Sequence, residues 1–380
     1  MKQTILAGAA IVTPNGVLEG CRLTIRGGRI ERISPDNPFD ESNNVIRYDG
    51  GYILPGFVDV QVNGGGGLLF NDETTVDALR TIAIAHARHG TTALLPTLIS
   101  EDLQKISEAI NAVDAAISLG IPGIIGIHIE GPFLNSKHKG IHDASKFRSL
   151  DDAAFEILTK PGSGVRVVTV APEIVGCEVI SRLTRAGVRV AIGHTDATFS
   201  QACQALRAGA TAFTHLFNAM SPLQSREPGV VGAALVDRGS YVGIIADGAH
   251  VHPACIELAI NLRGADHVML VSDAMAGVGC DLEEFDLFGQ KISIKDNICR
   301  SENGTLAGSN LNMEDAFSNI EEWHSLDLST ISNMASYTPA KFLGIDSSYG
   351  AIAPGYRADL VHRSAGGKVT ETWIEGIRVQ

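Results

Sequence analysis

The chain has 380 residues, of which 44% are hydrophobic and 41 are glycines, and it contains no long polar tract. This length is sufficient for one large domain and a smaller one, and the composition excludes an intrinsically disordered chain. The formal net charge of -13 argues against binding to nucleic acid or anionic lipid, although a local basic patch would still hold a small phosphate ester.

The first fifty residues contain short β-like runs and no helical periodicity. Strands are predicted over Gln3 to Val12, Arg22 to Ile25 and Arg29 to Ile33, with Asn-Gly and Gly-Gly turns between them. The apolar part of the first run, Ile5 to Val12, is short and leads into the turn sequence Thr13-Pro14-Asn15-Gly16. We therefore interpret it as a strand rather than as the core of a signal peptide.

A different rhythm begins after Gly51, where short apolar runs alternate with polar loops and with segments of helical pattern. Eight strands that alternate with helices are typical of a (β/α)8 TIM-like barrel, whereas a doubly wound α/β sheet usually has fewer strands. The eight apolar runs span Ile53 to Val62, Thr92 to Leu98, Ile124 to Ile129, Val165 to Val170, Val188 to Ile192, Ala212 to Leu216, Tyr241 to Ile245 and His267 to Val271.

Helices are predicted between these strands, and most of them end at a glycine, as helix C-termini often do. The region 55–344 fits the size of such a barrel, about 250 residues plus insertions, and we assign it to the catalytic domain. The predicted helices include Val76 to His89, Leu103 to Leu119, Glu178 to Ala186, Ser200 to Ala208 and Pro253 to Leu262.

One insertion interrupts the alternation near the end of the barrel. Phe285 to Thr305 alternates like a strand and contains an Asn303-Gly304 turn, which predicts a hairpin over the barrel mouth. Helices are then expected over Met313 to His324 and Leu328 to Leu343.

The last residues return to β character, and we expect the tail Glu371 to Val379 to pair with the N-terminal strands. Residues 1–54 and 345–380 would then form one small β-sandwich domain, built from both ends of the chain.

Cysteine spacing and hydropathy predict the cellular compartment of the protein. The six cysteines are scattered and include no CxxC pair, which favours reduced thiols over a disulfide scaffold or a cysteine zinc site. No apolar run approaches the roughly 20 residues that cross a bilayer. We therefore expect a soluble cytoplasmic protein without a membrane partner.

Polar residues follow the predicted strands at the C-terminal mouth of the barrel, where catalytic groups of such barrels lie. The third strand ends in His128-Ile129-Glu130, and the fifth, sixth and eighth lead to His194, His215 and Asp273. Two imidazoles and one carboxylate are ligands that zinc takes at catalytic sites. A lone histidine in such a loop is more often a hydrogen-bonded residue, but three matched strand ends favour a metal site of Glu130, His194 and His215.

Two neighbours of this set have competing interpretations. Asp273 is the natural general base, because a carboxylate beside activated water can accept a proton and return it to a leaving amine. Taken alone, the same aspartate is better explained as a helix N-cap. His128 shares a strand face with Glu130, and we interpret it as a supporting or packing residue rather than as a ligand.

Candidates for substrate recognition lie in the remaining loops, namely Lys139-Gly140-Ile141-His142, Asn218-Ala219, Arg226 and His250. In isolation, Arg226 is more typical of a solvated or ion-paired side chain than of a phosphate contact, and His250 is ambiguous. The glycine run 64–67 lacks the ending and the helix of a phosphate-binding P-loop, so we interpret it as a turn.

Together and in order, these motifs resemble the N-acetylglucosamine-6-phosphate deacetylase family of the amidohydrolase superfamily, over nearly the whole chain. Each block is weak alone, whereas the ordered set is highly specific. The matching blocks are Pro55-Gly56-Phe57-Val58-Asp59, residues 128–132, Gly193-His194-Thr195, residues 215–220, Arg226-Glu227-Pro228-Gly229, Ala246-Asp247-Gly248, Ser272-Asp273-Ala274, residues 304–309 and residues 352–360.

The resemblance implies that Glu130, His194 and His215 hold a divalent metal, with Zn2+ first among the candidates, and that Asp273 is the catalytic acid and base. We expect His142 to stabilise the developing oxyanion. The resemblance also implies a phosphorylated amino sugar as substrate and a homodimer, in which a phosphate contact comes from the neighbouring subunit. The implied substrate-binding residues are Ile141, His142, Asn218, Ala219, Arg226, His250, Leu306, Ala307 and Gly308.

The first strand departs from many relatives in this superfamily. Where binuclear members carry a His-x-His pair, this chain has Gln61 and Asn63. Amides are poor zinc ligands compared with imidazole, so one metal per subunit is predicted.

The expected reaction is hydrolysis of the acetamide of N-acetylglucosamine 6-phosphate to glucosamine 6-phosphate and acetate. Three alternatives stay open: N-acetylgalactosamine 6-phosphate as substrate, a cyclic amide as substrate, and a catalytically silent barrel. Ring-opening relatives usually have a binuclear centre, often with a carboxylated lysine, and no strand end presents a lysine at the fitting place. A silent copy would be expected to lose part of the metal and Asp273 set.

Overall fold

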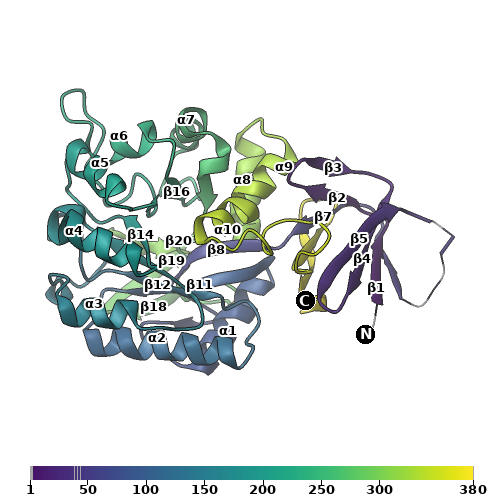
Figure 1. The fold of residues 1–380 in the computed structure, drawn as a ribbon, viewed down its shortest axis with the longest axis horizontal. Coiled ribbons are helices and arrows are strands. Elements are labelled where there is room, and N and C mark those ends of the chain that lie inside the picture. Colours follow the sequence, from purple (N-terminus) through teal and green to yellow (C-terminus); the bar gives the residue numbers. More distant parts are fainter. Residues whose placement is uncertain (1–2, 38, 41, 43, 380) are drawn as a thin grey trace.

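The computed structural model describes residues 3–37, 39–40, 42 and 44–379, and its two parts lie side by side along the long axis (Figure 1). A sheet surrounded by helices occupies one end, and two smaller sheets occupy the other, where both chain ends lie (Figure 1). None of the described helices combines the length and apolar character that crossing a bilayer requires.

The larger part is a parallel eight-stranded sheet whose neighbouring strands follow one another in sequence order. A parallel bridge between Val62 and Ala274 joins the last strand region to the first, which closes the sheet and confirms the predicted barrel. Every residue of the first two strands is buried, as expected when helices cover a parallel sheet. The strands are β8 (Phe57–Val62), β11 (Thr91–Ile99), β12 (Gly126–Glu130), β13 (Val165–Val170), β14 (Arg189–Ile192), β15 (Ala212–Phe213), β16 (Tyr241–Ile244) and β17 (Val268–Leu270).

Capping residues explain where several barrel helices begin. The side chain of Thr75 accepts a hydrogen bond from Ala78 N at the start of the first helix, and Thr198 and Gln201 form a capping box at the fifth. The helices are α1 (Val76–Ala87), α2 (Leu103–Ser118), α3 (Asp152–Thr159), α4 (Pro172–Arg185), α5 (Phe199–Arg207), α6 (Gly229–Val236), α7 (Pro253–Arg263) and α8 (Met313–Trp323).

Two predicted helices differ from the observed ones. The helix expected from Glu178 begins at Pro172, and Gly176, with φ 77°, interrupts its helical geometry. The helix expected over Leu328 to Leu343 consists of α9 (Leu328–Ser332), a π-helical turn over Asn333–Tyr337 and α10 (Thr338–Leu343). Periodicity alone does not resolve such local changes of pitch.

The smaller part consists of two sheets, one with strand order β5-β4-β1-β6 and the other with order β24-β23-β22-β7-β2-β3. Side chains from both chain ends, among them Leu6, Leu23, Leu360 and Trp373, form its separate hydrophobic core. The strands are β1 (Gln3–Ala7), β2 (Ala10–Thr13), β3 (Gly16–Leu18), β4 (Cys21–Arg26), β5 (Arg29–Pro35), β6 (Val45–Arg47), β7 (Tyr52–Pro55), β22 (Leu360–Arg363), β23 (Val369–Ile374) and β24 (Ile377–Arg378).

Two expectations for this part were wrong in detail. The run Gln3 to Val12 is two strands, because Gly8 turns the chain at φ 82°, where a Cβ atom would lie 2.2 Å from Tyr48 O. The C-terminal strand that pairs with an N-terminal one is β22, which pairs with β7, whereas the tail from Glu371 pairs with β22 and, through β24, with itself. The domain boundaries at 54/55 and 344/345 stay a prediction.

The apolar run Ile53 to Val62 also serves two sheets. Its first part is β7 in the small domain and its second part is β8 in the barrel, with Gly56 between them. Gly56 N donates to Asp359 O at 2.8 Å, and a Cβ atom at this glycine would lie 2.0 Å from Thr92 Oγ1. Only glycine therefore fits this crossing point.

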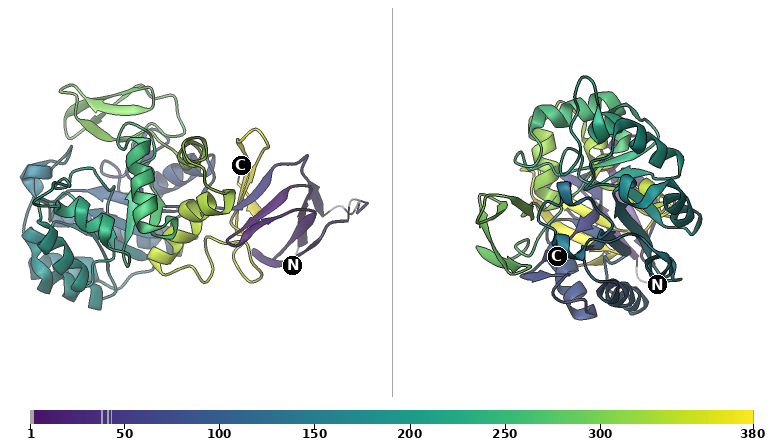
Figure 2. Two further views of the ribbon diagram at one scale, coloured as in Figure 1. Left: turned by 90° about the horizontal axis from the view of Figure 1, so that it is seen from above. Right: turned by 90° about the vertical axis from the view of Figure 1, so that its left-hand side faces the viewer.

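The predicted hairpin over the barrel mouth is a complete antiparallel sheet of four strands, β18 (Glu284–Leu287), β19 (Gln290–Lys295), β20 (Ile298–Ser301) and β21 (Leu306–Ser309). Figure 2 shows this sheet in light green at the edge of the barrel. Ser309 forms a bridge with Ala274, beside the end of the eighth barrel strand. The insertion therefore contributes directly to the wall of the mouth.

A buried histidine makes the stability of this fold depend on pH. His86 on α1 is fully buried and binds Gly64 O through Nε2 at 2.8 Å, and burial lowers its pKa from 6.5 to about 4. The unfolded chain binds the proton more readily, so stability falls as pH decreases from the unfolded pKa toward the folded one.

Replacing His86 by Gln keeps an amide donor for Gly64 and removes the titration. We expect the loss of unfolding free energy between about pH 7.5 and about pH 5 to be smaller by about 2 kcal/mol in His86→Gln than in the unmodified chain. Urea unfolding at the two pH values measures this difference, and an equal pH dependence in both proteins would contradict it.

Candidate active site

Three buried side chains converge at the C-terminal mouth of the barrel. Glu130 is the last residue of β12, whereas His194 and His215 follow β14 and β15. Glu130 Oε1 lies 3.1 Å from His194 Nε2 and 2.9 Å from His215 Nε2, and the two nitrogens are 3.0 Å apart. Ligands of one tetrahedral zinc ion lie roughly 3.3 Å apart, so the three atoms form a group that could hold one ion.

Hydrogen bonding at the far side of His194 supports this assignment. Its Nδ1 lies 2.8 Å from His138 O, and a carbonyl oxygen only accepts, so Nδ1 carries the hydrogen. In the neutral ring Nε2 then presents a lone pair to Glu130 and His215. Burial raises the pKa of Glu130, but the adjacent His194 and His215 rings hold it well below the usual value. An anionic carboxylate oxygen that faces the His194 lone pair, with His215 Nε2 3.0 Å from His194 Nε2, suits a divalent cation.

Gln61 and Asn63, at the end of the first barrel strand, donate hydrogen bonds to carboxylates of the site. Gln61 Nε2 donates to Glu130 Oε2 at 3.1 Å and to Asp273 Oδ1 at 3.0 Å. Asn63 Nδ2 donates to the same Asp273 oxygen at 2.7 Å. Both amide nitrogens are therefore engaged as donors to carboxylates of the site.

The same contacts leave one oxygen of Asp273 for chemistry. Among the described residues, none donates a hydrogen bond to Oδ2, whereas Oδ1 accepts from two amides. Burial, followed by the nearby Glu130 carboxylate, raises the pKa of Asp273 to about 6. A carboxyl group with such a pKa exchanges protons readily near neutral pH.

The backbone at three of these residues adopts the left-handed conformation that non-glycine residues rarely occupy. The φ angles are 48° at His194, 32° at His215 and 52° at Asp273. Each such residue costs of order 1–3 kcal/mol, and such residues gather at functional sites, where the surrounding structure holds them.

A cavity of about 360 Å³ opens above these residues. It is lined by the site residues and by most of the predicted substrate contacts, namely Ile141, His142, Asn218, Ala219, His250, Leu306 and Gly308. His250 Nδ1 is 2.6 Å from Asp247 Oδ2, so a carboxylate orients its ring.

Two predicted contacts do not line this cavity. Arg226 is exposed on the loop before α6, and Ala307 is buried within β21. Their predicted roles stay predictions. Sequence analysis missed Ser100, which lies directly after β11 and whose Oγ is 2.7 Å from His142 Nδ1. Ser100 could have been proposed as a candidate from its position at the end of a predicted strand.

His128 lies beneath the site rather than in it. Its Nε2 is 2.7 Å from Thr169 Oγ1, the ring is fully buried, and burial lowers its pKa to about 4. His128 is not part of the group of possible metal ligands among the described residues. It therefore has the surroundings of a packing or supporting residue, as the strand pattern predicts.

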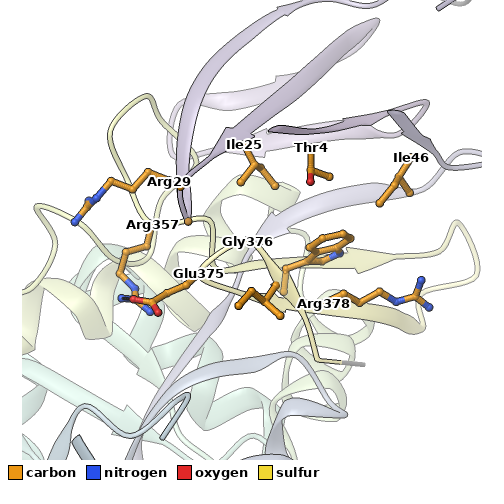
Figure 3. A pocket seen from close by; sticks show the side chains of 12 residues that line it. Thr4, Ile25, Arg29, Ile46, Arg357, Glu375, Gly376 and Arg378 are labelled. Atoms are coloured by element: carbon orange, nitrogen blue, oxygen red, sulfur yellow. Dashed lines mark hydrogen bonds and ion pairs between the residues drawn. The ribbon is translucent and has the colours of Figure 1, made fainter. Parts of the chain in front are cut away.

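A larger cavity, of about 760 Å³, lies in the small domain and carries no comparable chemistry (Figure 3). Its arginine side chains are already engaged: Arg357 with Asp359 and Glu375, Arg378 with Glu371, and Arg29 with the carbonyl oxygen of Gly355. Ile25, Ile46 and Thr4 form the opposite wall in Figure 3. Of the two cavities, only the one at the barrel mouth combines possible metal ligands with an available carboxylate.

Comparison with known proteins finds relatives over nearly the whole chain. The amidohydrolase family model matches residues 52–379. An N-acetylgalactosamine-6-phosphate deacetylase of a Shewanella species is 40% identical over 376 residues, which cover 98% of this chain and 95% of the relative. An N-acetylglucosamine-6-phosphate deacetylase of Haemophilus influenzae is 33% identical over 98% of each chain.

A solved structure gives the same result for the fold. The crystal structure of N-acetylglucosamine-6-phosphate deacetylase from Pasteurella multocida superimposes with a TM-score of 0.96 at 32% identity, covering 99% of each chain. Sequence and fold thus both match over nearly the whole chain, and this chain belongs to the amidohydrolase family.

Proposed function

We propose that this protein is a metal-dependent hydrolase that removes the acetyl group from an N-acetylamino sugar 6-phosphate, with N-acetylglucosamine 6-phosphate as the first candidate. The observation that carries the proposal is the buried Glu130, His194 and His215 group beside Asp273, in one cavity. Relatives that match this chain from end to end are deacetylases of this substrate class.

The chemistry follows from the positions of these residues. A Zn2+ ion held by Glu130, His194 and His215 would lower the pKa of a bound water to about 7 and polarise the acetamide carbonyl. Asp273 accepts the proton of the attacking water at Oδ2, which the amides of Gln61 and Asn63 leave available. Asp273 then returns this proton to the sugar nitrogen, so that acetate and the free amino sugar phosphate leave.

The remaining cavity residues bind and orient the substrate. His142 lies on the cavity wall beside His194, with ring centroids 4.4 Å apart, where it would stabilise the developing oxyanion. His250 and Arg226 are the proposed phosphate contacts. Because Arg226 lies outside the cavity of its own chain, we propose a homodimer in which the partner supplies this arginine. Six free cysteines agree with a cytoplasmic location.

N-Acetylgalactosamine 6-phosphate is a second candidate, and a specific observation favours it. The Shewanella relative with this activity is 40% identical, whereas the Haemophilus influenzae relative that acts on the gluco compound is 33% identical. The two sugars differ only in the configuration at one hydroxyl, so the same metal site serves either substrate.

Acetate release from the two phosphorylated sugars and from unphosphorylated N-acetylglucosamine tests the proposal. We expect release from a 6-phosphate substrate to exceed release from the unphosphorylated sugar, and the ratio of kcat/KM values identifies the preferred epimer. No release from any of the three sugars by zinc-loaded protein would refute the proposed function.

Metal content provides an independent prediction. We expect one zinc per chain by mass spectrometry, because the amides of Gln61 and Asn63 donate to carboxylates where a second ion would need ligands. Chelation should abolish acetate release, and one equivalent of zinc should restore it. Two tightly bound ions per chain would contradict the single-metal site.

A further inference from the structure

Ser100 connects two parts of the proposed active site. It lies directly after β11 and is fully buried. Its backbone N–H donates to Glu130 O at 3.0 Å, and its Oγ lies 2.7 Å from His142 Nδ1. The hydroxyl therefore contacts the ring proposed to stabilise the oxyanion, while the backbone contacts the strand end that carries a proposed metal ligand.

The surroundings of the Ser100 hydroxyl indicate which atom donates. A hydroxyl can donate to an imidazole nitrogen or accept from it, so the other acceptors within reach decide where its hydrogen points. Ser100 Oγ lies 2.7 Å from His142 Nδ1, well within hydrogen-bond range. Among the described residues, the one other acceptor that Ser100 Oγ contacts is Glu130 O, which is 3.5 Å away and already accepts from the Ser100 backbone. A serine proton directed at His142 Nδ1 makes the better of the two bonds.

The direction of this bond decides what His142 presents to the cavity. A neutral imidazole carries one hydrogen, and a divalent cation on the adjacent His194 disfavours a second positive charge on the neighbouring ring. If Nδ1 accepts from Ser100, the hydrogen is on Nε2. His142 then offers a donor to a developing oxyanion; in the other tautomer it would offer only a lone pair, which repels that charge.

We infer that Ser100 is a positioning residue that fixes the tautomer of His142 with hydrogen on Nε2, toward the substrate carbonyl oxygen. The inference deepens the proposed deacetylase function and rests on it for its catalytic consequence. The tautomer itself is a property of the protein without substrate, so it can be measured whether or not the reaction has been identified.

The first test is nitrogen NMR of zinc-loaded protein labelled with 15N at its 12 histidines. His142→Gln identifies the His142 signals by their disappearance. We expect an unprotonated Nδ1 and a protonated Nε2 at His142. A protonated Nδ1 with an unprotonated Nε2 would overturn the inference, and because this experiment uses the unmodified chain it does not depend on a variant that folds.

The second test compares three variants. Ser100→Ala should lose the fixed tautomer and lower kcat about 10–100-fold, the usual cost of removing a partner that orients a catalytic group, with KM and zinc content little changed. Ser100→Thr restores the hydroxyl and should recover much of the rate. Ser240→Ala is the matched control, because Ser240 is a buried hydroxyl that donates to Asp237 at 2.6 Å, before β16 at the opposite end of the barrel.

The outcomes separate the inference from the proposed function. A His142 tautomer that is unaffected in Ser100→Ala, or a loss of kcat as large in Ser240→Ala, would overturn the role of Ser100. The unmodified protein could instead show the expected His142 tautomer, lose it in Ser100→Ala, and yet release no acetate. That result would refute the deacetylase function and leave the role of Ser100 in fixing the tautomer intact.

Discussion

Asp273→Asn should lower kcat by about 10²–10⁴-fold while the chain keeps its metal, because the substitution removes the group that moves the proton. Asparagine has the shape of aspartate, and its Oδ1 can still accept from Gln61 and Asn63, which now donate at 3.0 and 2.7 Å. The metal group Glu130, His194 and His215 is unchanged. Steady-state acetate release and zinc content by mass spectrometry measure the two effects separately.

Asp286→Asn is the matched control for this variant. Asp286 is exposed on β18, in the sheet beside the cavity, so the control removes one carboxylate from that region without touching the site. Its kcat should equal that of the unmodified chain. An Asp273→Asn protein that retains substantial turnover would show that another group transfers the proton.

Glu130→Gln should lose both metal and activity, which distinguishes it from the previous variant. The substitution removes the only carboxylate of the metal group and leaves an amide, a poorer ligand without charge. We expect zinc affinity to fall more than about 100-fold, beyond the cost of losing a supporting partner. Competition with a chelator of known affinity measures this change.

Excess zinc provides a second readout on Glu130→Gln. Activity should return in part at high zinc, whereas Asp273→Asn should not respond to zinc at all. Glu101→Gln serves as the control and should bind zinc normally. Glu101 follows Ser100 in the sequence, and its carboxylate pairs with Lys146 rather than with the metal group. Normal zinc affinity in Glu130→Gln would exclude Glu130 as a ligand.

Hydrophobic pattern predicted the barrel strands well because buried parallel strands are nearly continuous apolar runs. The run Val165 to Val170 matches β13 residue for residue. Errors occurred where tertiary contacts override local pattern. Gly8 divides one apolar run because its backbone turns beneath Tyr48, and Gly56 divides another because the chain crosses between two sheets beside Thr92. Neither partner is near its glycine in sequence.

Residue type and strand position together predicted the convergence of Glu130, His194, His215 and Asp273 at one mouth, because the ends of parallel barrel strands meet there. The same reasoning recognised Gln61 and Asn63 as poor ligands but not as donors to Asp273. Which atoms of the amides and hydroxyls meet depends on side-chain rotamers, and spacing along the chain carries no information on those. The place of Ser100 at a strand end could have marked it as a candidate, but its contact with His142 depends on rotamers in the same way.

The continuous segment that forms β7 and then β8 ties the two parts of the molecule into one mechanical unit. β7 pairs with β2 and β22 in the small domain, while β8 is the first strand of the barrel and carries Gln61. A truncation that removes the small domain would leave the barrel's opening strand without an anchor at its N-terminal end. We therefore expect a single melting transition for the whole chain, and an excised barrel that aggregates rather than a minimal enzyme.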